Sequence, residues 1–111
     1  MVVRVGKFDV TPEILYREGK AVSVKTYCVF NMSDVGMSEY AINPDGTFTE
    51  RHYDPEHGGS LQPRLVPRSR LEELDTHNPK SIPLLQVLGL DRGAVEALIA
   101  QRGFDVKHLA A

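Results

Sequence analysis

The sequence predicts an α+β domain: a small antiparallel β-sheet from the N-terminal half packed against two or three short C-terminal helices. Alternating, β-branched stretches before residue 54 suggest strands, and apolar residues at helical spacing after residue 71 suggest helices. Strands followed by helices favour this layout over a parallel α/β sheet. With 111 residues we expect one domain: mainly strands over 1–53, a long Pro/Gly loop over 54–70 and mainly helices over 71–111.

The first twenty residues contain one clear element and one ambiguous element. Val3 and Val5 alternate with charged residues, as in a half-buried strand. Residues 11–20 allow two interpretations. Thr11 followed by Pro12 is a good helix start, but the same segment also suits two strands joined at Glu18 and Gly19. A short helix and a hairpin both stay open.

Residues 21–30, "AVSVKTYCVF", form the strongest strand pattern in the sequence. Strict alternation places five side chains on one face: Val22, Val24, Thr26, Cys28 and Phe30. Cys28 on this apolar face indicates a small packed core residue. A reactive thiol at Cys28 is the disfavoured alternative.

The next element is a hairpin centred on Asn43-Pro44-Asp45-Gly46. Pro44 presets φ for the second position of a type I turn, and Gly46 supplies the positive φ that returns the chain. This turn makes residues 39–42 and 47–53 antiparallel partners.

The C-terminal third predicts short helices. We expect one over 69–77, one between Ser81 and Gly89, and one that begins after Asp91 and ends at Gly103. Their apolar faces should cover the sheet: Leu84, Leu85, Leu88, Val95, Leu98 and Ile99. Residues 104–111 add one more turn or a strand.

Composition excludes several functional classes. A net charge of −2 and a pI near 6.1 argue against a general nucleic-acid or anionic-membrane binder. No apolar run would span a bilayer, and the first ten residues lack the apolar core of a signal peptide, which is typical of a cytoplasmic protein. A single cysteine forms no intrachain disulfide. No glycine spacing matches a nucleotide-binding loop, so we expect no cofactor and do not favour an enzyme.

The stretch "TERHYDPEHGG" is the strongest candidate for chemistry. His52, Asp54 and His57 carry imidazole and carboxylate ligands that suit a catalytic metal. The competing interpretation is a polar strand end that runs into a loop. On that interpretation Phe48, Glu50 and His52 share one face and Thr49, Arg51 and Tyr53 share the other, and the polar residues suit an exposed strand face or sheet edge. We favour the second, so the metal-dependent enzyme is an alternative.

The segment "LLQVLGLDRGAVEALIAQRG" resembles the helix-turn-helix of bacterial DNA-binding domains. The resemblance covers about a fifth of the chain and implies that the second helix contacts DNA through Arg92, Gln101 and Arg102. Over residues 81–111, however, three basic side chains balance three acidic ones, so phosphate attraction is weak. DNA binding is therefore a second alternative.

The function that the sequence favours is a non-enzymatic regulator or accessory subunit that binds another protein. The proline-punctuated loop carries Arg64, Arg68 and Arg70, which are the expected binding residues. An exposed sheet edge would also allow a homodimer.

Overall fold

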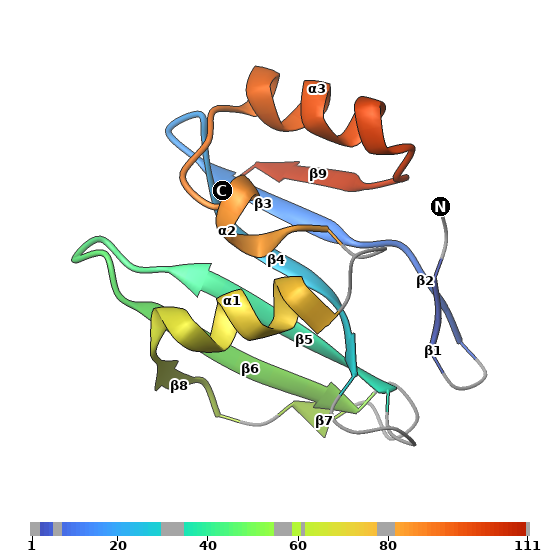
Figure 1. The fold of residues 1–111 in the computed structure, drawn as a ribbon, viewed down its shortest axis with the longest axis vertical. Helices are drawn as coiled ribbons and strands as arrows, with labels where there is room; N and C mark the ends of the chain where they lie inside the picture. The colour runs from blue at the N-terminus through green and yellow to red at the C-terminus, as the bar shows by residue number, and fades with distance from the viewer. Residues whose placement is uncertain are drawn as a thin grey trace.

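The computed structural model describes residues 3–5, 8–29, 35–54, 59–60, 62–77 and 82–110, with side chains at 11–26, 37–53, 62–76 and 82–110. The predicted α+β class is confirmed. Three helices lie over one face of a mixed sheet (Figure 1). The strand order is β7-β6-β5-β4-β3-β9, and β8 also pairs with β6.

The strands of this sheet are β3 (Glu13–Arg17), β4 (Lys20–Val29), β5 (Val35–Ile42), β6 (Phe48–Asp54), β7 (Gly59–Ser60), β8 (Arg64–Val66) and β9 (Lys107–Ala110). The helices are α1 (Arg68–His77), α2 (Leu84–Val87) and α3 (Arg92–Arg102). A separate hairpin of β1 (Val3–Val5) and β2 (Phe8–Val10) projects beside the sheet, where β1 approaches β5 (Figure 1).

The hairpin interpretation of residues 11–20 is correct. β3 and β4 pair antiparallel, and the turn between them uses Glu18 at φ 53° and Gly19 at φ 80°. Two consecutive left-handed residues give the type I′ turn whose twist matches that of the strands.

A bulge in this hairpin changes which β4 residues enter the core. Leu15 pairs with Ser23, but the next residue, Tyr16, pairs with Ala21, so Val22 is the extra residue. Ala21 is therefore in the core together with Val24, while Val22 is only half-buried. The strict alternation expected across residues 21–30 is wrong at Val22 for this reason. Phe30 and the side chain of Cys28 lie outside the described residues.

The Asn-Pro-Asp-Gly turn has the predicted geometry. The amide of Gly46 donates to the carbonyl of Asn43 at 2.9 Å, and Gly46 has φ 86°. The resulting register pairs Ile42 with Phe48 and Tyr40 with Glu50. This register positions the site described below.

Residues 54–70 are not one continuous loop, which corrects the sequence expectation. β7 and β8 both pair with the open side of β6, and α1 already begins at Arg68. Pro63 and Pro67 flank β8, so the alternating pattern of a strand is too short to recognise in the sequence. An edge strand of three residues nevertheless tolerates a proline on each side.

The helical end follows its predicted caps. The Asp91 carboxylate accepts a hydrogen bond from the Ala94 amide at 2.9 Å, and Gly103 ends α3 at φ 72°. Asp75 of α1 accepts from the amides of Leu84 and Leu85, which fixes the start of α2. Among the described residues, no helix is long and apolar enough to cross a bilayer.

The core lies between the sheet and the helices. From the helices and the residue after α2 it includes Leu71, Leu74, Leu84, Val87, Leu88, Val95 and Ile99, and from the sheet it includes Ile14, Tyr16, Ala21, Val24, Tyr40 and Phe48. The last strand, β9, pairs in parallel with β3, so the sheet is not wholly antiparallel as expected.

Candidate functional site

A buried carboxylate lies at the centre of the most polar part of the core. Cross-strand register places Glu50 of β6 between Tyr40 of β5 and Arg64 of β8. Glu50 is only 1% exposed. An acid this deeply buried must be paired or protonated, because leaving an isolated charge in the core costs several kcal/mol.

Side chains from three other elements, β5, β8 and α1, donate to the two oxygens of Glu50. Arg64 donates to Oε1 through Nε at 3.1 Å and Nη2 at 2.7 Å. Arg70, from the first turn of α1, donates to Oε2 through Nε at 3.0 Å, and the hydroxyl of Tyr40 donates to the same oxygen at 2.8 Å. The carboxylate therefore ties β5, β6, β8 and α1 together.

A second polar row adjoins this carboxylate. In register, Thr26 lies opposite Ser38, and Ser38 lies opposite His52. The Ser38 hydroxyl is 2.7 Å from His52 Nδ1, and His52 Nε2 is 3.2 Å from Glu50 Oε1. With its proton on Nε2, a neutral His52 donates to Glu50 and accepts from Ser38. The hydroxyl of Thr26 is buried without a hydrogen-bond partner.

The environment of Glu50 lowers its pKa. Burial alone raises the pKa of this carboxyl, but the hydrogen bonds from Arg64, Tyr40 and Arg70 outweigh burial and hold it below the ordinary value. Glu50 is thus a carboxylate at neutral pH, and its single negative charge offsets one of the two positive charges that Arg64 and Arg70 bring to it.

A serine, a histidine and a carboxylate in series is also the arrangement that activates a nucleophile. Ser38, however, is 0% exposed, so no substrate reaches its hydroxyl in this structure. The series therefore acts here as a hydrogen-bonded brace between β5 and β6.

The expectation that the polar side chains of this strand face solvent is wrong for Glu50. Phe48, Glu50 and His52 share a face, as predicted, but that face is the one that the helices cover, and Phe48 belongs to the core. Alternation shows which residues share a face and not which face is buried. Phe48 on the same face as Glu50, with Tyr40 opposite, was the signal that could have revealed the cluster.

The metal hypothesis rests partly on residues outside the described ones. His52 bonds to Ser38 and Glu50, while His57 and the side chain of Asp54 are not described. Among the described side chains, no group of three His, Cys, Asp or Glu residues is placed to hold a metal ion. The His52–Asp54–His57 site stays a prediction.

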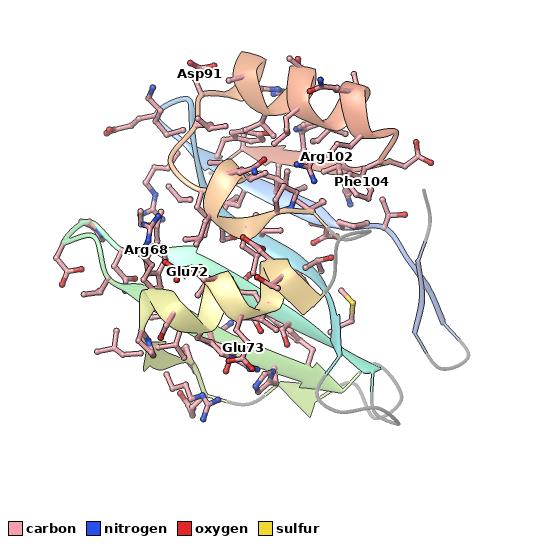
Figure 2. The ribbon with its side chains drawn as sticks, in the orientation of Figure 1. Arg68, Glu72, Glu73, Asp91, Arg102 and Phe104 are labelled. Carbon is pink, nitrogen blue, oxygen red and sulfur yellow. The ribbon has the colours of Figure 1, made fainter. Side chains whose placement is uncertain are left out.

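The three predicted binding arginines do not form one cluster. Arg64 and Arg70 converge on Glu50, whereas Arg68 pairs with Glu72 at 3.2 Å. Figure 2 shows Arg68 and Glu72 on one side of α1 and Glu73 on the other. Arg68 therefore lies apart from the surface that the other two arginines reach.

Beside Arg64 and Arg70 the structure has a pocket of about 330 Å³. Its lining consists of Arg64, Leu65, Val66, Pro67, Ser69, Arg70 and Glu73. Leu65 is 70% exposed, and no other large apolar side chain in the described part of the chain is exposed. The set of lining residues is called the β8–α1 surface below.

The arginines of α3 contact their own domain. Arg92 bonds to Glu96 at 2.9 Å, and its guanidinium lies 5.7 Å from the centre of the Tyr16 ring. Arg102 donates to Gln86 of α2 at 3.2 Å, and Gln101 is exposed. α2 has only four residues, so the first helix of the helix-turn-helix pattern is a single turn. DNA contact through Arg92, Gln101 and Arg102 stays a prediction.

Comparison with known proteins adds no relative: no family model, no curated protein and no solved structure matches this chain.

Proposed function

We propose that the protein is a regulator or accessory subunit that binds another protein through the β8–α1 surface. The observation that carries this proposal is the pocket beside Leu65, which joins one highly exposed apolar side chain to anchored arginine side chains. A contiguous exposed apolar surface rimmed by polar groups is typical of protein–protein contact sites, and Leu65, Val66 and Pro67 supply the apolar part of this one.

The arginines contribute to binding because they are held in place before any partner arrives. Glu50 fixes the guanidinium of Arg64 through two donors, while the side chain of Arg64 is still 65% exposed. An arginine that is already ordered loses less conformational entropy on binding than a free surface arginine.

The same anchoring changes how the proposal must be tested. Reversing the charge of Arg64 or Arg70 would leave Glu50 buried without its partner, so lost binding could not be separated from lost stability. Arg68 is removed from the candidate contact residues because it lies outside the pocket lining.

Leu65 offers a cleaner test. A photo-crosslinking amino acid placed at position 65 in the native host should capture a discrete protein on irradiation. The same amino acid at Ala97, an exposed position on α3, is the matched control. A band seen at position 65 and absent at position 97 supports the proposal. No adduct at 65, or identical adducts at both positions, contradicts it.

A further inference from the structure

We infer that the partner contributes an extended segment, paired as a strand onto the open edge of β8, with an acidic side chain directed at Arg64. This inference rests on the proposed function and specifies the chemistry of the partner at the same surface.

Among the described residues, β8 is paired on one side only. β8 pairs with β6 from Arg64 to Val66, and no described strand lies on its other side. An edge strand presents unpaired backbone N–H and C=O groups, which an extended peptide can satisfy. The pocket is lined by the consecutive residues 64–67 together with Ser69, Arg70 and Glu73 of α1, so it lies along this strand where the chain enters the helix.

The length of the docked segment follows from the flanking prolines. Pro63 and Pro67 have no amide hydrogen, and the amides of a strand point alternately to its two sides, so at most two of the amides of Arg64, Leu65 and Val66 face the open edge. We therefore expect a short partner strand of about four or five residues, with affinity that depends on its side chains.

Charge sets the polar part of the partner. The lining carries two arginines and one glutamate, and Glu73 already takes part in an interaction of its own. The carboxylate of Glu50 has no exposed surface and reaches only the protein side of Arg64. Arg64 uses Nε and Nη2 on Glu50, which leaves Nη1 to donate to a carboxylate of the partner.

The alternation of side chains along β8 determines where the partner segment carries its apolar residue. Arg64 pairs opposite Glu50 on the helix-covered face, and Leu65 pairs opposite Thr49 on the other face. A strand laid beside β8 alternates in the same way. Its acidic residue would then lie next to Arg64, and a β-branched or aromatic residue next to Leu65.

A random dodecapeptide library displayed on phage, selected on the immobilised full chain, tests this inference. We expect enriched sequences to alternate β-branched or aromatic residues with Glu or Asp in a fixed register. A selected peptide should shift the amide resonances of residues 64–66 in a heteronuclear NMR titration. No enrichment, or shifts confined to α3 and β9, overturns the inference.

Changes in the selected peptide avoid any folding problem in the protein. Alternate N-methylation of its backbone should weaken binding at least about tenfold, because each methyl group removes a backbone hydrogen bond to β8 and leaves a β8 carbonyl unpaired. Replacing its acidic residue by the neutral amide should weaken binding by about five- to tenfold. Binding that withstands either change overturns the strand mode or the charge assignment, respectively.

The two proposals fail separately. Crosslinking at position 65 without peptide binding retains the protein partner and overturns the strand-edge mode. Peptide binding without any adduct at position 65 in the host retains the strand-edge mode and overturns the proposed function.

Discussion

At the residue scale, Glu50 links the sheet to helix α1, which packs on it. One carboxylate accepts hydrogen bonds from β5, β8 and α1 while it is almost fully buried. Such a group contributes stability only while all of its partners stay in place, since each unpaired charge would carry its full desolvation cost.

Replacing Glu50 by Gln should therefore be costly. The amide keeps the shape but removes the charge and turns an N–H group toward one of the arginines. We expect a loss of about 2–3 kcal/mol in the free energy of unfolding, below the range for fully buried pairs because Arg64 is largely exposed. Urea denaturation at pH 7 measures it. Glu72→Gln, which removes the exposed partner of Arg68, should cost less than about 1 kcal/mol. Equal losses in the two variants would contradict the central role of Glu50.

The lowered pKa of Glu50 also predicts a pH dependence. The ordinary value is 4.5, and the folded value lies below it, so the unfolded chain takes up a proton first as pH falls. The contribution of Glu50 is complete above the ordinary value and is lost as pH falls through the folded value. Urea midpoints from pH 7 to pH 3 should fall less steeply for Glu50→Gln than for the unmodified protein. Parallel curves would show that other carboxyls govern acid unfolding.

The sequence shows part of this residue-scale picture. The turn at residues 43–46 fixes the pairing of Tyr40 with Glu50 in advance, because the turn type sets the register. It could not show that Arg64 and Arg70 reach Glu50. That contact depends on the pairing of β8 with β6 and on the residue at which α1 begins. The two prolines that flank β8 keep it from being recognised as a strand in the sequence.

At the element scale, strong local sequence signals correctly predicted where a helix begins and ends. Asp91 and Gly103 set the start and end of α3, since a cap acts within one helical turn. The ambiguity over residues 11–20 was settled by the β4 strand. A hairpin gives residues 13–17 a pairing partner immediately along the chain, and a helix would leave that edge of β4 open.

Two substitutions in the turn of this hairpin should change the free energy of unfolding in opposite directions. Glu18 adopts a left-handed conformation that asparagine accepts more readily, so Glu18→Asn should raise the free energy of unfolding by about 0.5–1 kcal/mol. Gly19→Ala should lower it by about 1 kcal/mol. A Cβ at Gly19 would meet no atom within 4 Å, so that loss would come from the backbone conformation alone. Thermal unfolding of both variants is the measurement, and changes of the same sign would refute the turn assignment.

At the scale of the whole molecule, the last strand in the sequence joins the sheet beside one of the first strands. β9 pairs in parallel with β3, and the Tyr16 hydroxyl lies 2.8 Å from His108 Nδ1 across a separation of 92 residues. The sequence left the tail open between a turn and a strand. Pairing over such a distance has no local signature, because it depends on the sheet edge that the rest of the fold creates.

This long-range contact should form late in folding. Closing a loop of this length costs entropy before the contact gives any stability, whereas the β3–β4 and β5–β6 hairpins close locally. Burial raises the pKa of Tyr16, so its hydroxyl stays protonated while it shares a hydrogen bond with His108. Tyr16→Phe removes that hydroxyl and keeps the stacked rings, whose centres lie 5.5 Å apart.

We expect Tyr16→Phe to lower the free energy of unfolding by about 1 kcal/mol and to express that loss as faster unfolding, about fivefold, with an unchanged refolding rate. Stopped-flow refolding and unfolding over a range of urea concentrations separate the two rates. Gly19→Ala is the matched comparison, because a strained local turn should slow refolding if the β3–β4 hairpin forms early. Slower refolding in Tyr16→Phe with unchanged unfolding would place the β3–β9 pairing in the folding nucleus, and the sheet would then assemble from its two distant edges instead of from its local hairpins.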